Sequence, residues 1–142
     1  MNVTAKTEYA CIAVLELAAR HEVSEPVRIR DIAQTHGIPS RFLVQILLQL
    51  KSAGLVVSLR GASGGYRLAK EPADITLHEV MSAVDNQSAT IESSAGRVTP
   101  TTRVLLGNWK RVAARERELL GAVTFGDLVR QLQTQGEAMY HI

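Results

Sequence analysis

The sequence of 142 residues contains a single cysteine, Cys11, and no uninterrupted run of the roughly 18 apolar residues that a membrane span needs. One cysteine excludes a disulfide framework within the chain and any metal site built from several thiolates of one chain. The N-terminal residues Met1 to Lys6 lack the apolar region of a signal peptide. We therefore expect a cytoplasmic protein that does not associate with membranes.

Residues that carry catalysis or bind metals are also sparse. No Ser/His/Asp set, paired acids or cofactor fingerprint stands in a recognisable context, so we expect neither an enzyme nor a cofactor. Cys11 has no neighbouring base in the sequence to lower its pKa, which favours a small core residue over a redox thiol. The four histidines lack the spacing of metal ligands and are His21, His36, His78 and His141.

The positive charge of the chain is concentrated in one segment. Seven basic residues and one acidic residue, Asp31, lie between Pro26 and Lys70, which gives this segment a charge of +6 against +2 for the whole chain. Such a block is consistent with a solvated face and equally with a surface that binds a polyanion. The motif within the segment has to decide between these alternatives.

The first half of the chain has the pattern of a helix-turn-helix. Helices are predicted over residues 4–20, 28–36 and 39–53, and Gly37 and Gly54 end the second and third of them. Two helices joined by a short turn that contains glycine are typical of this motif. The inward-facing apolar residues recur at helical spacing and include Ala10, Ala13, Val14, Leu17, Ile29, Ile32, Ala33, Leu43, Ile46, Leu47 and Leu50.

A β-hairpin is predicted directly after the helix-turn-helix. Alternating and β-branched residues over 55–60 and 66–69 flank the glycine-rich run 61–65, which is the pattern of a wing. The run also has the composition of a loop that holds nucleotide phosphates. A P-loop, however, joins a strand to a helix and ends in Gly-Lys-Ser/Thr, whereas this run joins two strands and ends in Gly65-Tyr66.

Three further segments complete the chain. Thr76 and Glu79 form a capping box for a helix that ends near Asp85, with Leu77, Val80, Met81 and Val84 on its apolar face. A helix over 101–120 carries one apolar stripe, Leu105, Trp109, Val112 and Leu119, which predicts dimerisation through a partner helix. Thr124 and Asp127 cap a last helix with Phe125, Leu128, Val129 and Leu132 at helical spacing.

The predicted fold is mainly α with a small β-wing, a winged helix-turn-helix with a long dimerisation helix. We expect residues 1–85 to form the DNA-binding domain and residues 86–100 to form a polar loop. Residues 101–142 then form the dimerisation helix and the C-terminal helix.

The chemistry of the third helix suits the major groove of DNA. If its apolar residues face the core, its exposed side carries Ser40, Arg41, Val44, Gln45 and Gln49. Arginine can donate twice to guanine, glutamine can pair with adenine, and valine can contact a thymine methyl group. Arginine and glutamine are also ordinary residues of a solvated helix face. Arg60 and Arg67 flank the hairpin tip, where small residues allow close approach to a phosphate or a minor groove.

Several motifs stand together over nearly the whole chain, namely Thr4-Ala5-Lys6, Tyr9-Ala10, Asp31-Ile32-Ala33, residues 37–47, 50–56 and 60–66, and Trp109. In this combination the sequence resembles the Rrf2 family of winged helix-turn-helix transcription regulators, of the IscR, NsrR and CymR type. The resemblance implies a dimer in which the helix around Trp109 crosses its partner, and DNA contacts from Arg41, Val44, Gln45 and Arg60 and near Lys6. The full predicted set of DNA-binding residues is Lys6, Arg28, Ser40, Arg41, Val44, Gln45, Arg60, Ser63 and Arg67.

The chain departs from the family at the segment where many relatives hold an iron-sulfur cluster with three cysteines. Residues 92–106 contain neither cysteine nor histidine, and thiolates are the ligands that hold such clusters. We therefore expect a variant without the cluster, regulated by a small molecule or a protein.

The sequence leaves three classes of function to be distinguished. The first is a sequence-specific DNA-binding regulator, a repressor that binds a pseudo-palindromic operator as a homodimer. The second is an adaptor that keeps the winged-helix fold but binds a protein instead of DNA. An enzyme is the weakest alternative because it requires a catalytic constellation that the sequence lacks.

Overall fold

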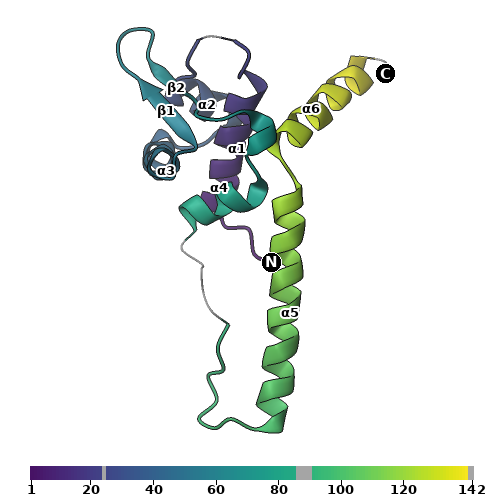
Figure 1. The fold of residues 1–142 in the computed structure, drawn as a ribbon. Helices are drawn as coiled ribbons and strands as arrows, with labels where there is room; N and C mark the ends of the chain where they lie inside the picture. Colours follow the sequence, from purple (N-terminus) through teal and green to yellow (C-terminus); the bar gives the residue numbers. More distant parts are fainter. Residues whose placement is uncertain (24, 86–90, 141–142) are drawn as a thin grey trace.

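The computed structural model describes residues 1–23, 25–85 and 91–140 (Figure 1). Residues 86–90, which open the predicted polar loop, and His141 lie outside the described residues. The predicted fold class is confirmed, because a mostly helical chain carries a small two-stranded sheet. The elements are α1 (Ala5–Ala19), α2 (Ile29–His36), α3 (Ser40–Ser52), β1 (Val56–Leu59), β2 (Gly65–Leu68), the 3-10 helix η1 (Pro72–Asp74), α4 (Leu77–Val84), α5 (Pro100–Ala122) and α6 (Phe125–Tyr140).

The ends of the first three helices follow from local chemistry. The Thr4 side chain accepts a hydrogen bond from the Thr7 backbone N–H and caps α1. Gly37 ends α2 in the left-handed conformation, with φ 66° and ψ 36°. Gly54 follows α3 with φ 78°, a value that side-chain-bearing residues rarely adopt. These two glycines set the turns on either side of α3 and so orient it.

The core gathers around α1. The inward residues predicted for α1 and α3 are all buried, and Leu43, Leu47 and Leu50 have no exposed surface. Ile32 and Ala33 of α2 are buried in the same cluster. This packing fixes the backbone of α3, because its whole apolar row is held against α1, α2 and α4.

The wing is an antiparallel pair in which Val56 lies opposite Leu68 and Leu59 lies opposite Gly65. A third segment joins it, because Val27 and Tyr66 exchange two backbone hydrogen bonds of 2.8 Å. At Gly65 an added Cβ would lie 2.6 Å from the Val27 carbonyl oxygen. The backbone of the wing therefore approaches the segment before α2 more closely than a side chain would allow.

The long helix α5 begins far from the bundle that contains α1 to α4 and runs back to it, and α6 starts at the bundle and extends toward the C-terminus (Figure 1). The Leu77 N–H donates to the Val123 carbonyl at 3.0 Å, and the Phe125 N–H donates to the Ile75 carbonyl at 2.8 Å. Phe125 is fully buried in the main core. The segment that links α5 to α6 is thus tied to the N-terminal half of the chain by backbone bonds and by one aromatic side chain.

The last helix begins as its sequence predicts, since Thr124 and Asp127 exchange hydrogen bonds of 3.0 Å between their backbone N–H groups and side chains. It packs against α1 and η1. Of the four residues at helical spacing on this helix, Phe125 is buried and Leu128 and Val129 are partly buried against the core, whereas Leu132 is 44% exposed. No helix in the described ranges is long and apolar enough to cross a membrane.

Candidate nucleic-acid interface

Helix α3 divides into a buried apolar face and an exposed mixed face. The exposed face carries Ser40, Arg41, Val44 and Gln45, all in its first two turns. Val44 is 43% exposed, whereas its neighbour Leu43 is fully buried. Three hydrogen-bonding side chains and one apolar side chain are therefore held on a rigid helix and open to solvent.

An aromatic pair supports Arg41. The guanidinium carbon of Arg41 lies 5.0 Å from the centre of the Phe42 ring. The Phe42 ring in turn lies 6.2 Å from that of Tyr9 in α1, at an interplanar angle of 38°. Contacts of this kind favour an arginine that stacks on the ring while its N–H groups stay free to donate.

The expectation that Gln49 belongs to the exposed face is wrong. Gln49 is half-buried, and its side-chain oxygen Oε1 is buried without a hydrogen-bond partner. The position lies at the boundary between the two faces of α3, next to the buried Leu50. Helical spacing alone places such boundary residues poorly, because the neighbouring helix decides which side is covered.

Two exposed apolar residues of α3, Phe42 and Leu48, are absent from the predicted site. They are 45% and 48% exposed, which is unusual for large apolar side chains. Leu48 follows Arg41 and Gln45 at helical spacing, and this repeat was a signal that could have included it. Phe42 could be recognised only from its contact with Tyr9, which no local pattern predicts.

The wing presents three of the predicted residues, Arg60, Ser63 and Arg67, and all three are exposed. Its tip is a tight turn in which the Gly64 N–H donates to the Gly61 carbonyl at 2.9 Å. Gly61 has φ 103°, and a Cβ at Gly64 would lie 2.4 Å from the Leu59 carbonyl oxygen. A bare backbone at these positions leaves the tip narrow enough to enter a groove.

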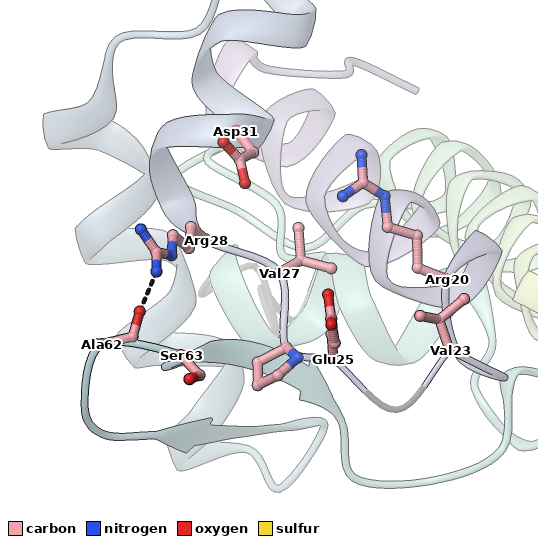
Figure 2. A pocket seen from close by; sticks show the side chains of 9 residues that line it. Arg20, Val23, Glu25, Val27, Arg28, Asp31, Ala62 and Ser63 are labelled. Carbon is pink, nitrogen blue, oxygen red and sulfur yellow. Dashed lines mark hydrogen bonds between the residues drawn. The ribbon is translucent and has the colours of Figure 1, made fainter.

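The two remaining predicted residues are Arg28 and Lys6. Arg28 is exposed, but its guanidinium donates to the Ala62 backbone carbonyl at the wing tip (Figure 2). Lys6 is exposed in the first turn of α1. The structure thus gives Arg28 a contact within the protein that the sequence did not predict, while its remaining N–H groups stay available.

The apolar stripe of α5 is open to solvent in the single chain. Leu105, Trp109, Val112 and Leu119 are exposed by 47%, 56%, 65% and 66%. No residue of α5 is buried within the described chain. A continuous exposed stripe of this size is typical of a surface that pairs with another helix.

The residues present do not fit an iron-sulfur cluster of the kind that the family resemblance implies. Residues 91–99, between α4 and α5, contain no cysteine or histidine. Burial raises the pKa of the Cys11 thiol to about 11, which disfavours the thiolate that a cluster needs. Within the described ranges no three His, Cys, Asp or Glu side chains are placed to hold a metal ion.

Comparison with known proteins shows the protein family of this chain. Residues 3–131 match the Rrf2 family, described as iron-dependent transcriptional regulators. The chain belongs to the Rrf2 family. The HTH-type transcriptional regulator IscR of Vibrio atlanticus strain LGP32 is 37% identical over 133 residues, which span 92% of this chain and 76% of the relative.

Solved structures of Rrf2 regulators have the same fold. CymR, the global cysteine regulator of B. subtilis, superposes with a TM-score of 0.79 at 31% identity, over 92% of this chain and 98% of that chain. T. potens IscR superposes with a TM-score of 0.73 at 31% identity, over 93% of this chain and 88% of that chain. These similarities confirm the prediction of a DNA-binding transcriptional regulator rather than an enzyme.

Proposed function

We propose that this Rrf2 protein is a sequence-specific repressor that binds a pseudo-palindromic operator as a homodimer and holds no iron-sulfur cluster. The observation that carries the proposal is the exposed row of Arg41, Val44 and Gln45 on α3, backed by an apolar face without exposed surface. A helix built in this way can enter a major groove without loss of core packing.

The row on α3 has the chemistry of base recognition. Arg41 can donate to O6 and N7 of a guanine, and Gln45 can pair with N6 and N7 of an adenine. Val44 lies between them and can contact the methyl group of a thymine. Ser40, at the start of the helix, lies where the first turn of a recognition helix approaches the DNA backbone.

The wing and the flanks supply contacts that do not depend on sequence. Arg60, Arg67 and Ser63 surround a narrow tip that suits phosphates or a minor groove. Lys6 and the free N–H groups of Arg28 add positive charge on either side. Such contacts fix the position of α3 and make binding sensitive to salt.

The dimer forms through α5. The apolar stripe of α5 packs against the same stripe of a second copy, which removes apolar surface from water. Its residues are Leu105, Trp109, Val112 and Leu119. A two-fold dimer requires a pseudo-palindrome whose half-sites lie about 34 Å apart or a multiple of that distance. The protein acts in the cytoplasm. When it occupies an operator that overlaps a promoter, it excludes RNA polymerase, which is the basis of repression.

The regulatory signal is carried by a small molecule or a protein instead of a cluster. This part of the proposal rests on the absence of cysteine and histidine from residues 91–99. The family is described as iron-dependent, but this segment lacks the cysteine and histidine side chains that would bind an iron-sulfur cluster.

The test is selection of fragments from the host genome by the purified protein, followed by gel-shift titrations at several salt concentrations. We expect a shared pseudo-palindrome and an affinity that falls steeply as salt rises, since binding releases counterions. Equal affinity for selected and scrambled duplexes would contradict sequence-specific binding. Absence of DNA binding, with retention of a protein partner, would support the adaptor alternative.

A further inference from the structure

We propose that a cavity behind the wing tip binds a small zwitterion of the α-amino acid class, and that the bound molecule holds the wing in its DNA-contacting position. The binding site itself is independent of the DNA-binding hypothesis. Its effect on the operator rests on the proposed function. The cavity is thus a candidate for the sensor that replaces the missing cluster.

The cavity has a volume of about 350 Å³ and lies between three segments of the chain (Figure 2). Arg20 at the end of α1 lines one side, and the start of α2 contributes Arg28 and Asp31. Ala62 and Ser63 contribute the wing tip. A volume of this size lies at the lower end of the range for small-molecule sites. It accommodates an amino acid.

Charges of both signs meet at the cavity. Arg20 and Arg28 provide two guanidinium groups, while Glu25 and Asp31 provide two carboxylates. Arg20 pairs with Glu16 at 3.5 Å, and Arg28 donates to a backbone carbonyl. Among the residues that the structure describes, neither Glu25 nor Asp31 has an ion-pair partner within 4.0 Å.

This set of charges selects the ligand. An arginine binds a carboxylate through two parallel hydrogen bonds, and carboxylates of the protein accept hydrogen bonds from an ammonium group. A dianion would be repelled by Glu25 and Asp31, and a dication would be repelled by Arg20 and Arg28. A molecule with one group of each sign satisfies both pairs. Val23, Pro26 and Val27 form an apolar wall for a short side chain.

The cavity is mechanically connected to the wing. Arg28 lines it and donates to the Ala62 carbonyl, while Val27 pairs with Tyr66 of β2. A ligand bound between Arg28 and Asp31 would order the Arg28 side chain and therefore its contact with the wing tip. Ligand binding and DNA binding then favour the same arrangement, which makes them mutually reinforcing.

The first experiment measures ligand binding to the purified full-length protein without DNA. Each common L-amino acid is titrated in a calorimeter up to about 10 mM, a range that covers weak millimolar binding. We expect at least one to bind, with affinity reduced at least about tenfold in Asp31→Asn and Glu25→Gln, since each removes one charge from the site. Glu22→Gln is the matched control, because this exposed carboxylate of the same segment does not line the cavity.

The second experiment measures operator affinity with and without the amino acid that binds. We expect saturating ligand to tighten operator binding about tenfold, and Asp31→Asn to abolish this change. Binding by none of the amino acids, or equal binding by wild type and both cavity variants, would overturn the site. Tighter operator binding by the two variants without ligand would assign the cavity to DNA phosphates and also contradict the proposal. An amino acid that binds with no effect on operator affinity would overturn the coupling.

Failure of the proposed function is distinguishable from failure of the sensor. The calorimetric titration contains no DNA, so it reports on the cavity even if the protein binds no operator. The operator titration without ligand reports on DNA binding even if the cavity binds no amino acid.

Discussion

The guanidinium carbon of Arg41 lies 5.0 Å from the centre of the ring of Phe42, which contacts Tyr9. The ring limits the conformations of Arg41 before any DNA is bound, so less side-chain entropy is lost on binding. A recognition arginine that is ordered in advance discriminates between bases more sharply than one that is free. This contact identifies Arg41 as the first residue to test.

Replacement of Arg41 or Gln45 by alanine should weaken operator binding by about 1 to 3 kcal/mol and relax base preference at one or two positions. The reason is that base edges lose a bidentate partner, while the phosphate contacts persist. Titrations against operator and scrambled duplexes measure the effect. Arg130→Ala is a control, because this exposed arginine lies on α6 beside Asp127. If Arg41→Ala lost the same affinity for both duplexes, α3 would not be the helix that recognises the bases.

Replacement of Arg60 by alanine should weaken operator and random DNA to a similar extent. A lost phosphate contact should also reduce the slope of log affinity against log salt by about one unit. The measurement is a series of titrations at several salt concentrations for both duplexes. An effect restricted to the operator would indicate that the wing reads bases, and the division of roles between α3 and the wing would be wrong.

The variant Trp109→Glu should dissociate the dimer. It places a carboxylate in the middle of the α5 stripe, where burial of an unpaired charge is costly. Sedimentation velocity measures the change, and operator affinity should fall with it because each monomer contacts one half-site. Leu132→Glu is a matched control on α6, since Leu132 is exposed but lies outside the stripe. A dimeric Trp109→Glu variant would show that another surface pairs.

Anaerobic incubation with iron and sulfide should leave operator affinity unchanged. Residues 91–99 offer no thiolate or imidazole, and the raised pKa of Cys11, about 11, keeps that thiol protonated at neutral pH. Absorbance spectra before and after desalting, with parallel gel shifts, provide the measurement. A stable chromophore whose removal abolishes operator binding would contradict the assignment of a cluster-free regulator.

The capping box of α4 predicts a specific pH dependence. The hydrogen bond from Lys70 to Glu79, 2.9 Å long, holds the pKa of this carboxyl below its usual range. Its contribution to the free energy of unfolding is present above the unfolded pKa and is lost as pH falls through the folded pKa. Glu79→Gln should therefore be less stable than wild type at neutral pH.

In urea titrations the gap between Glu79→Gln and wild type should close as the solution becomes acidic, because wild-type Glu79 is then protonated. Glutamine can still accept the hydrogen bond from Thr76 N–H, so the cap itself is retained. A gap that is independent of pH would assign the effect to packing instead of charge.

The sequence was sufficient to predict the features that depend on residues close together in the chain. The spacing of Leu43, Leu47 and Leu50 predicted the buried face of α3, and Gly37 and Gly54 predicted its flanking turns. Such features follow from helical periodicity and from the conformations that glycine permits.

Features that depend on distant segments could not be predicted. The contact of Arg28 with Ala62 joins residues 34 positions apart, and the 3-10 helix η1 packs against α6, which lies far along the chain. The DNA-contact and dimer roles stay predictions, because they concern molecules outside the chain.

Phe125 and the two backbone bonds at Ile75 and Leu77 hold the end of α5 against the bundle and so fix the direction in which this helix projects from it. In a symmetric pair, that direction sets how far apart the two copies of α3 stand and how each is rotated about the DNA axis. In the proposed dimer, the operator length that the protein accepts would then depend on the packing of this hydrophobic core. Relatives with the same base preference can consequently diverge in the promoters they recognise through substitutions at this junction alone.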